Sequence, residues 1–221
     1  MNSIKYLKLD LRMIKSQWYW ALFTFAVAPI LAIKMNMIYL GFAFLFLGAM
    51  AMLPIPFNAE KSFKSGFYEL LPATTQTKVL GRYLFLVTLS SISALACYLL
   101  LTAARFWGIQ ITKIEVFIIL TIMLMVFCIE CVQYIIYYKI ETFKNPQIAN
   151  GFKAIPLFIV MFGSSFFSDW ITDNLSSVPA ILNIINKQII AIFFVEIGIM
   201  LIILLVSIFA SVHICEKKEI Y

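Results

Sequence analysis

The stretch IIAIFFVEIGIMLIILLVSIFASVHI, residues 189–214, is the longest of the apolar runs that could cross a membrane in this chain. Its 26 residues contain a single carboxylate and a single histidine. About 20 apolar residues are enough for a helix to cross a hydrocarbon core about 30 Å thick. The whole chain has 221 residues, of which 63% are hydrophobic and 13% charged, whereas soluble domains are about one-quarter charged. The composition therefore predicts an all-α polytopic membrane protein and excludes a soluble enzyme, a disordered chain and a nucleic-acid-binding module, despite a net charge of +6.

Five further stretches are long and apolar enough, or nearly so, to be membrane spans. No stretch could form a second, soluble domain, so residues 1–221 are predicted to be a single transmembrane domain. The first and fifth spans are the shortest. The six predicted spans cover residues 17–33, 37–57, 83–104, 116–138, 154–170 and 189–214.

The distribution of lysine and arginine predicts the orientation of these spans. Cytoplasmic segments of membrane proteins carry an excess of both residues. Of the 17 here, 13 lie in the N-terminus, the 58–82 and 139–153 loops and the C-terminus, and four lie in the segments between. Six spans with both termini in the cytoplasm account for this split.

The first sixteen residues have the pattern of an amphipathic helix. Ile4, Leu7, Leu11 and Ile14 recur at helical spacing with basic residues among them. Such a helix can lie in the cytoplasmic interface of the membrane. The alternative is a positively charged flank that only fixes the topology.

The loop of residues 58–82 is too apolar for a simple solvated hairpin. Phe67, Tyr68, Leu70 and Leu71 lie close together in it, and Pro72 must end any helix formed by the residues before it. Thr74 or Thr75 can cap a new helix that leads into the third span. The apolar side chains predict either a docking surface for a partner protein or a helix lying on the lipid interface.

This loop resembles that of a known family. The run FYELLPAT (67–74), followed by KVLGRYL (78–84), is similar to the cytoplasmic loop of ABC-2 type permeases, and the predicted six-span topology is similar along the whole chain. In size, the chain resembles the permease subunits of phenol-soluble modulin and related peptide exporters.

The resemblance implies partners and roles. Such permeases are dimers of two copies or of paralogues, embedded in the lipid of the bacterial cytoplasmic membrane, and each half rests on a separate P-loop ATPase. A coupling helix near 62–71 would make that contact, and the N-terminal helix would be the connecting helix. The implied contact residues are Phe67, Tyr68, Glu69, Leu70 and Leu71.

The sequence contains no phosphate-binding loop, which agrees with an ATP site on another chain. A phosphate-binding loop needs the sequence Gly-x-x-x-x-Gly-Lys, and none of the eight glycines is followed by lysine. We therefore expect no cofactor and no enzymatic activity on this chain, with ATP and magnesium bound by the partner ATPase.

Two intramembrane acids are the sharpest candidates for a transport site. Glu130 lies within the fourth span, with Gln133 and Tyr134 three and four residues further on, and Glu196 lies in the sixth. An acid in a span normally faces protein or a water-filled cavity. The alternatives for each are a cavity or gate position and a buried, locally bonded side chain. Their depths differ by about 15 Å, so they do not form a carboxylate pair.

The leading hypothesis is the permease subunit of an ABC exporter of amphipathic peptides. The alternatives are an exporter of lipid or hydrophobic antibiotic, a stand-alone proton-coupled carrier using Glu130, and a non-transporting immunity or sensor subunit. An intramembrane protease would need paired glutamates and several histidines, and His213 is the only histidine. Cys128 and Cys131 form Cys-x-x-Cys, but on a membrane helix without partners for metal or redox chemistry.

Overall fold

A computed structural model describes four parts of the chain: residues 3–34, most of 41–57, 74–140 and 178–219. In the second part, the described residues are 41, 42, 44–46, 48, 52, 53 and 55–57. Every regular element among the described residues is helical, as the composition predicts. The fifth predicted span, 154–170, and loop residues 58–73 lie outside the described residues, so the count of six spans stays a prediction.

Three long helices match predicted spans. They are α5 (Thr75–Phe106), α6 (Lys113–Ile140) and α8 (Val178–Glu219). Each contains a segment that is long and apolar enough to cross a membrane. These helices contain the stretches 83–104, 116–138 and 189–214 and confirm that all three are helical. The structure therefore supports a multi-pass membrane protein.

Local sequence fixes where α5 and α6 begin. The Thr74 hydroxyl oxygen accepts a hydrogen bond from the Thr77 backbone amide at 3.4 Å, which confirms Thr74 as the cap of α5. At the start of α6, the Glu115 carboxylate accepts from the Thr112 backbone amide at 2.7 Å, and the Thr112 hydroxyl accepts from the Glu115 amide at 3.2 Å. This reciprocal pair is a capping box, which satisfies otherwise unpaired amides at a helix start.

The N-terminal region is one helical path with two irregular turns. Helix α1 (Ser3–Met13) leads through a 3-10 turn, η1 (Ile14–Gln17), into α2 (Trp18–Pro29), and a π-helical turn, η2 (Ile30–Lys34), follows. Pro29 has no backbone N–H to continue the α-helical ladder, and the wider turn begins directly after it. The predicted first span, 17–33, is therefore helical but irregular, and its apolar helix, Leu22–Ile33, is shorter than the three long ones.

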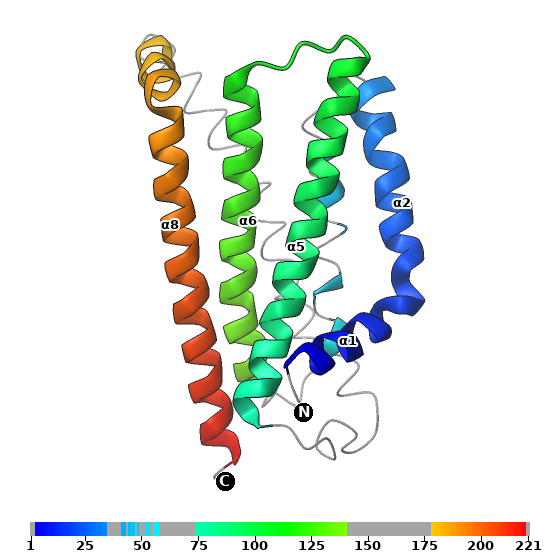
Figure 1. The fold of residues 1–221 in the computed structure, drawn as a ribbon, viewed down its shortest axis with the longest axis vertical. Helices are drawn as coiled ribbons and strands as arrows, with labels where there is room; N and C mark the ends of the chain where they lie inside the picture. The colour runs from blue at the N-terminus through cyan, green and yellow to red at the C-terminus, as the bar shows by residue number, and fades with distance from the viewer. Residues whose placement is uncertain are drawn as a thin grey trace.

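The helices form an elongated bundle with both chain ends at the same end (Figure 1). Helix α5 runs away from that end, and α6 and α8 both run back toward it. Helix α8 packs mainly on α6, and α1 crosses the first turns of α5. An even number of crossings is consistent with this placement of the termini.

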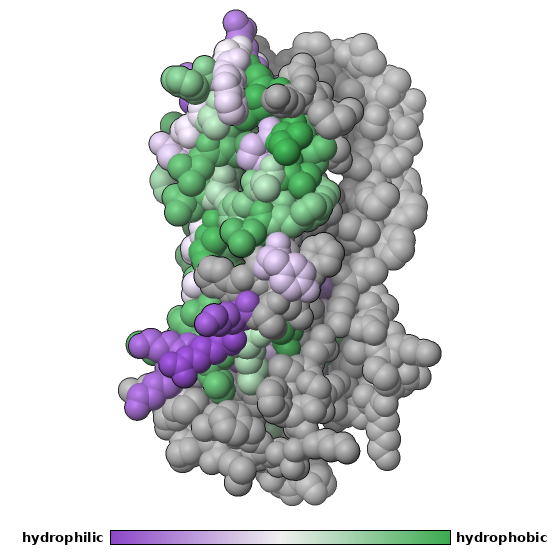
Figure 2. All heavy atoms as spheres, turned by 90° about the vertical axis from the view of Figure 1, so that its right-hand side faces the viewer, coloured by the Kyte–Doolittle hydropathy of each residue, from purple (hydrophilic) through white to green (hydrophobic). Residues whose placement is uncertain are grey.

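One end of the α1–α2 face is basic and the rest is apolar. Lys5, Lys8, Arg12 and Lys15 are exposed, and Figure 2 shows a hydrophilic patch at the lower end of this face with apolar surface above it. The exposed apolar side chains of α2 include Leu22, at 65%, and Phe23, at 50%. The pattern suits a helix pair whose basic end meets lipid headgroups.

Small residues bring the second predicted span close to α2. A Cβ added at Gly48 would lie 2.5 Å from the Thr24 hydroxyl oxygen, and one at Gly41 would lie 2.8 Å from the Ala28 carbonyl oxygen. Such contacts leave no room for a side chain. Close backbone approach at small residues is a common way for membrane helices to associate.

Candidate functional site

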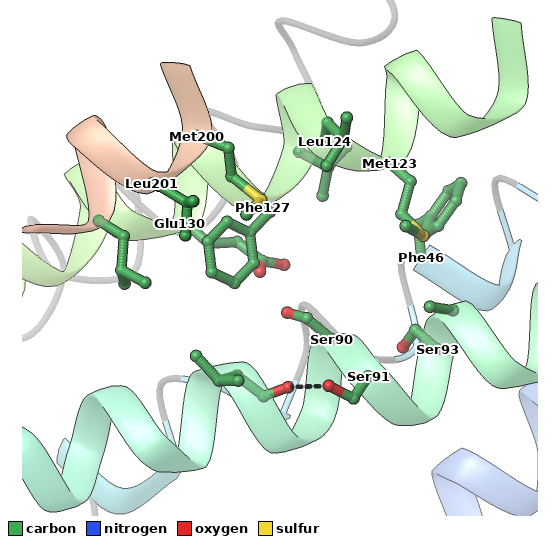
Figure 3. Close-up of a pocket in the computed structure, with 14 residues that line it drawn as sticks. Phe46, Ser90, Ser91, Ser93, Met123, Leu124, Phe127, Glu130, Met200 and Leu201 are labelled. Atoms are coloured by element: carbon green, nitrogen blue, oxygen red, sulfur yellow. Dashed lines mark hydrogen bonds between the residues drawn. The ribbon is translucent and has the colours of Figure 1, made fainter. Parts of the chain in front are cut away.

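A cavity of about 280 Å³ lies between α5, α6 and α8, with Phe46 also on its wall (Figure 3). Its walls are apolar except for three serines of α5 and one glutamate of α6. The lining residues are Phe46, Val87, Ser90, Ser91, Ser93, Ala94, Met123, Leu124, Val126, Phe127, Glu130, Met200, Leu201 and Leu204.

Glu130 is the only acidic side chain among these lining residues. It is 3% exposed, and its carboxyl group points toward the Ser90 hydroxyl of α5 (Figure 3). The Ser91 hydroxyl instead donates to the Val87 carbonyl oxygen of its own helix at 2.8 Å. The cavity is thus an apolar chamber with one carboxyl group, a site suited to an amphipathic ligand with a basic group.

The structure does not bring the four cavity or gate candidates together. Glu196 accepts hydrogen bonds from the Thr121 hydroxyl at 3.1 and 3.0 Å. Thr121 precedes Glu130 by nine positions on α6, or about 13 Å along the helix axis, which agrees with the predicted difference in depth. Gln133 is buried. Of the four candidates, only Glu130 lines the described cavity.

Tyr134 lies in an aromatic cluster nearer the end of the bundle that holds the termini. It is fully buried, and its ring centroid is 5.2 Å from that of Phe57 and 5.3 Å from that of Tyr83. Tyr137 and Tyr138 also pack on Phe57. Aromatic pairs at these distances are favourable, and this cluster joins α5 and α6 to the last residues of the predicted second span.

A hydroxyl network joins the three long helices beside this cluster. The Tyr83 hydroxyl of α5 bonds to the Ser207 hydroxyl and, at 2.9 Å, to the Ser211 hydroxyl of α8. The Ser207 hydroxyl donates to the Cys131 carbonyl oxygen of α6. These bonds satisfy buried hydroxyls in a region of the bundle that is otherwise apolar.

A buried ion pair links α1 to α5, and sequence reasoning missed it. The Arg82 Nε lies 3.7 Å from an Asp10 carboxylate oxygen, with the two side chains 2% and 0% exposed. Asp10 follows Tyr6 by four positions and precedes Ile14 by four, so the three share one face of the N-terminal helix. That spacing could have indicated a buried position for Asp10. However, a single acid among lysines is typical of a solvent-exposed residue.

Comparison with known proteins gives the family of the chain. A family model described as "ABC-2 family transporter protein" matches residues 6–216, which is nearly the whole chain. The chain belongs to the ABC-2 transporter family. No curated protein and no solved structure matches it.

Membership of the ABC-2 family supports the coarser functional predictions. The chain is a membrane permease component of an ABC transporter, and the family implies that an ATPase on another chain is its partner. The finer resemblance to peptide exporters stays a prediction. Residues Phe67, Tyr68, Glu69, Leu70 and Leu71 lie outside the described residues, so their implied ATPase contact stays a prediction too.

Proposed function

We propose that this ABC-2 chain is the permease subunit of an exporter that moves amphipathic peptides of the phenol-soluble modulin type out of the cell. It works as a dimer, with two copies or a paralogue, on two P-loop ATPase subunits in the bacterial cytoplasmic membrane. The observation that carries the proposal is the family match over residues 6–216. The dimer and the direction of transport are part of the proposal.

The ATPase docks on the loop of residues 58–82. Phe67, Tyr68 and Glu69 form the centre of its contact, with Leu70 and Leu71 beside them. The excess of lysine and arginine in this loop supports a cytoplasmic location. Both described ends of the chain lie at the end of the bundle where α5 begins, at Thr75 within this loop.

The cavity at Glu130 supports a cationic amphipathic cargo. Its apolar walls suit the apolar face of a peptide helix, and its carboxyl group suits a lysine. Methionine side chains such as Met123 and Met200 adapt to ligands of varied shape. A lipid or a hydrophobic antibiotic would use the same walls but would gain little from the carboxyl group.

The burial of Glu130 favours a second candidate function. A carboxyl group in a membrane helix is a common proton carrier, so a stand-alone proton-coupled carrier is the alternative. A carrier would move cargo under a proton gradient without ATP. The exporter would need ATP and would work without the gradient.

Co-purification tests the exporter. A C-terminally tagged protein, solubilised gently, should retain a stoichiometric P-loop ATPase, and changing Phe67, Tyr68 and Glu69 together to alanine should release it. The matched control is alanine at Phe106 and Trp107, which are 89% and 64% exposed at the opposite end of α5. Purification of the wild-type protein alone, with no effect of the triple change on transport, would overturn the proposal.

Cargo stimulation tests the role of Glu130. A cationic amphipathic peptide should raise the ATPase rate of the reconstituted wild-type complex, and Glu130→Gln should remove this stimulation because the basic group loses its counter-charge. Glu216→Gln is the control, since Glu216 is an exposed acid near the end of α8. Equal stimulation of the Glu130→Gln and wild-type complexes would reject the peptide site.

A further inference from the structure

We propose that the Asp10–Arg82 ion pair acts as a joint between helices. It makes α1, the first turns of α5 and residues 56 and 57, which precede the 58–73 segment, move as one unit. The role rests on the proposed function, because the joint transmits the movement that the ATPase imposes on that segment. Asp10 and Arg82 are thus positioning residues, and neither touches cargo.

Arg82 contacts two other parts of the chain, α1 and the adjacent residues Pro56 and Phe57. Its Nε lies 3.7 Å from the Asp10 carboxylate of α1. Its Nη2 donates to the Pro56 carbonyl oxygen at 3.5 Å, and its guanidinium carbon lies 4.1 Å above the centre of the Phe57 ring. A guanidinium on an aromatic face at this distance is a cation–π contact.

In the sequence, these contacts lie on either side of the proposed coupling segment. Pro56 and Phe57 come directly before residues 58–73, and α5 begins directly after them with Thr75. Arg82 lies in the second turn of α5. One guanidinium therefore ties the residues on either side of this segment to each other and to α1.

A second, independent contact fixes α1 to α5. A Cβ added at Gly81 would lie 2.7 Å from the Tyr6 Cβ and 3.1 Å from the Ser3 carbonyl oxygen. A side chain at this position would require α1 to shift away from α5, and Tyr6 is 1% exposed. The ion pair and the close approach at Gly81 together hold α1 in one register on α5.

Burial argues for a positioning role rather than stability alone. Desolvating two charges often cancels their attraction, so well-packed apolar replacements can be as stable as a buried pair. What an ion pair adds is a defined orientation, and here the guanidinium also contacts the Pro56 carbonyl oxygen and the Phe57 ring. Loss of the joint should therefore let the ATPase work without moving α1, which uncouples hydrolysis from transport.

The test separates coupling from stability in the reconstituted complex of the full chain and its ATPase. Asp10→Asn leaves a buried guanidinium without its counter-charge, so this variant can lose stability as well as coupling. The double variant Asp10→Asn/Arg82→Met removes both charges and should recover the yield and melting temperature of the wild type. Transport of a fluorescent cationic amphipathic peptide should nonetheless fall by about tenfold in the double variant, while basal ATP hydrolysis continues.

Matched controls remove single exposed charges from the same two helices. Lys8→Gln on α1 and Arg105→Gln near the end of α5 should keep wild-type transport, because both side chains are exposed. A tenfold loss in these controls as well would overturn the joint, since the effect would then follow charge and not the pair.

A disulfide tether provides a rescue. Tyr6→Cys and Gly81→Cys, added to the double variant, place two Cβ atoms close enough to be bridged once the helices part by about 1 Å. Oxidation should restore transport, and reduction should abolish it again, whereas neither single-cysteine variant should respond.

Three results would overturn the joint. The first is wild-type transport by Asp10→Asn/Arg82→Met in an assembled complex. The second is failure of a verified tether to restore transport. The third is inactivation of an otherwise wild-type complex by the tether, which would mean that α1 must leave α5. All three leave the exporter itself standing. Failure of the wild-type chain to bind an ATPase would instead overturn the proposed function, and this role with it.

Discussion

At the scale of single residues, two buried sites with acidic or basic side chains in the described part of the chain differ in their surroundings. Arg82 and Asp10 face each other where α1 crosses α5, with Phe57 and Pro56 around the guanidinium. Glu130 faces a cavity and a serine hydroxyl. A charge within the apolar bundle needs a partner or a cavity. The first arrangement suits a structural joint, and the second suits a site that receives a ligand.

Filling the cavity should block cargo without removing the carboxyl group. Ala94→Phe places a ring in the chamber that Ala94 lines, so peptide stimulation of the ATPase should disappear while basal hydrolysis remains. Ala191→Phe is the control, because Ala191 is exposed on α8. Normal stimulation of the Ala94→Phe complex would show that cargo does not enter this cavity.

The Tyr83 hydroxyl should contribute measurably to stability. Tyr83→Phe removes the bonds to Ser207 and Ser211, and a buried hydrogen bond is worth about 1 kcal/mol. The melting temperature in detergent should fall by several degrees. Tyr98→Phe should leave it unchanged, since Tyr98 is 63% exposed. Equal melting temperatures for the two variants would count against the network.

At the scale of elements, hydropathy predicts helices better than it predicts their contacts. The spans within α5, α6 and α8 were predictable because length and apolar content decide whether a segment spans a membrane. Their contact faces were not, because lipid-facing and protein-facing positions are equally apolar. In α8, for example, Ile203 packs on the core and Ile202 is 63% exposed, so hydropathy does not mark the face that contacts α6.

Helix α1 shows the same limit in a polar segment. The spacing predicted an apolar face of Ile4, Leu7, Leu11 and Ile14. In the structure Ile14 is buried and Leu7 and Leu11 pack partly on the core, but Ile4 is 62% exposed. The buried face instead includes Tyr6 and Asp10. A buried aspartate is predictable only with its partner, and Arg82 is distant in the sequence.

The packing of α1 against α5 should depend on Gly81. Gly81→Leu inserts a side chain where a Cβ alone is already too close to Tyr6, so α1 should detach and an N-terminal tag should become more sensitive to protease. Gly198→Leu should have no such effect, since nothing lies within 4 Å of a Cβ there. Equal protease resistance of the two variants would contradict the observed packing.

At the scale of the whole molecule, the topology and the family agree on a multi-pass permease component. The three long helices and the shared end of the termini came from the structure, and the ATPase partner is implied by the family. The distribution of lysine and arginine along the chain, in contrast, is what predicts which end faces the cytoplasm.

Cysteine labelling should confirm that orientation. In a background with Cys215→Ser, Gln110→Cys in the α5–α6 turn should react with a membrane-impermeant maleimide on intact cells. Glu216→Cys near the end of α8 should react only after permeabilisation. Both positions are exposed, so the reverse pattern would place the termini outside and reject a cytoplasmic 58–82 loop.

Residues 67–69 should contact a P-loop ATPase in the cell. Photo-crosslinking from a photoreactive residue at Phe67 measures this contact, with Trp107 at the opposite end of α5 as the matched control. We expect position 67 to capture a P-loop ATPase and position 107 not to capture one. Capture of an ATPase from position 107, or none from position 67, would contradict this expectation.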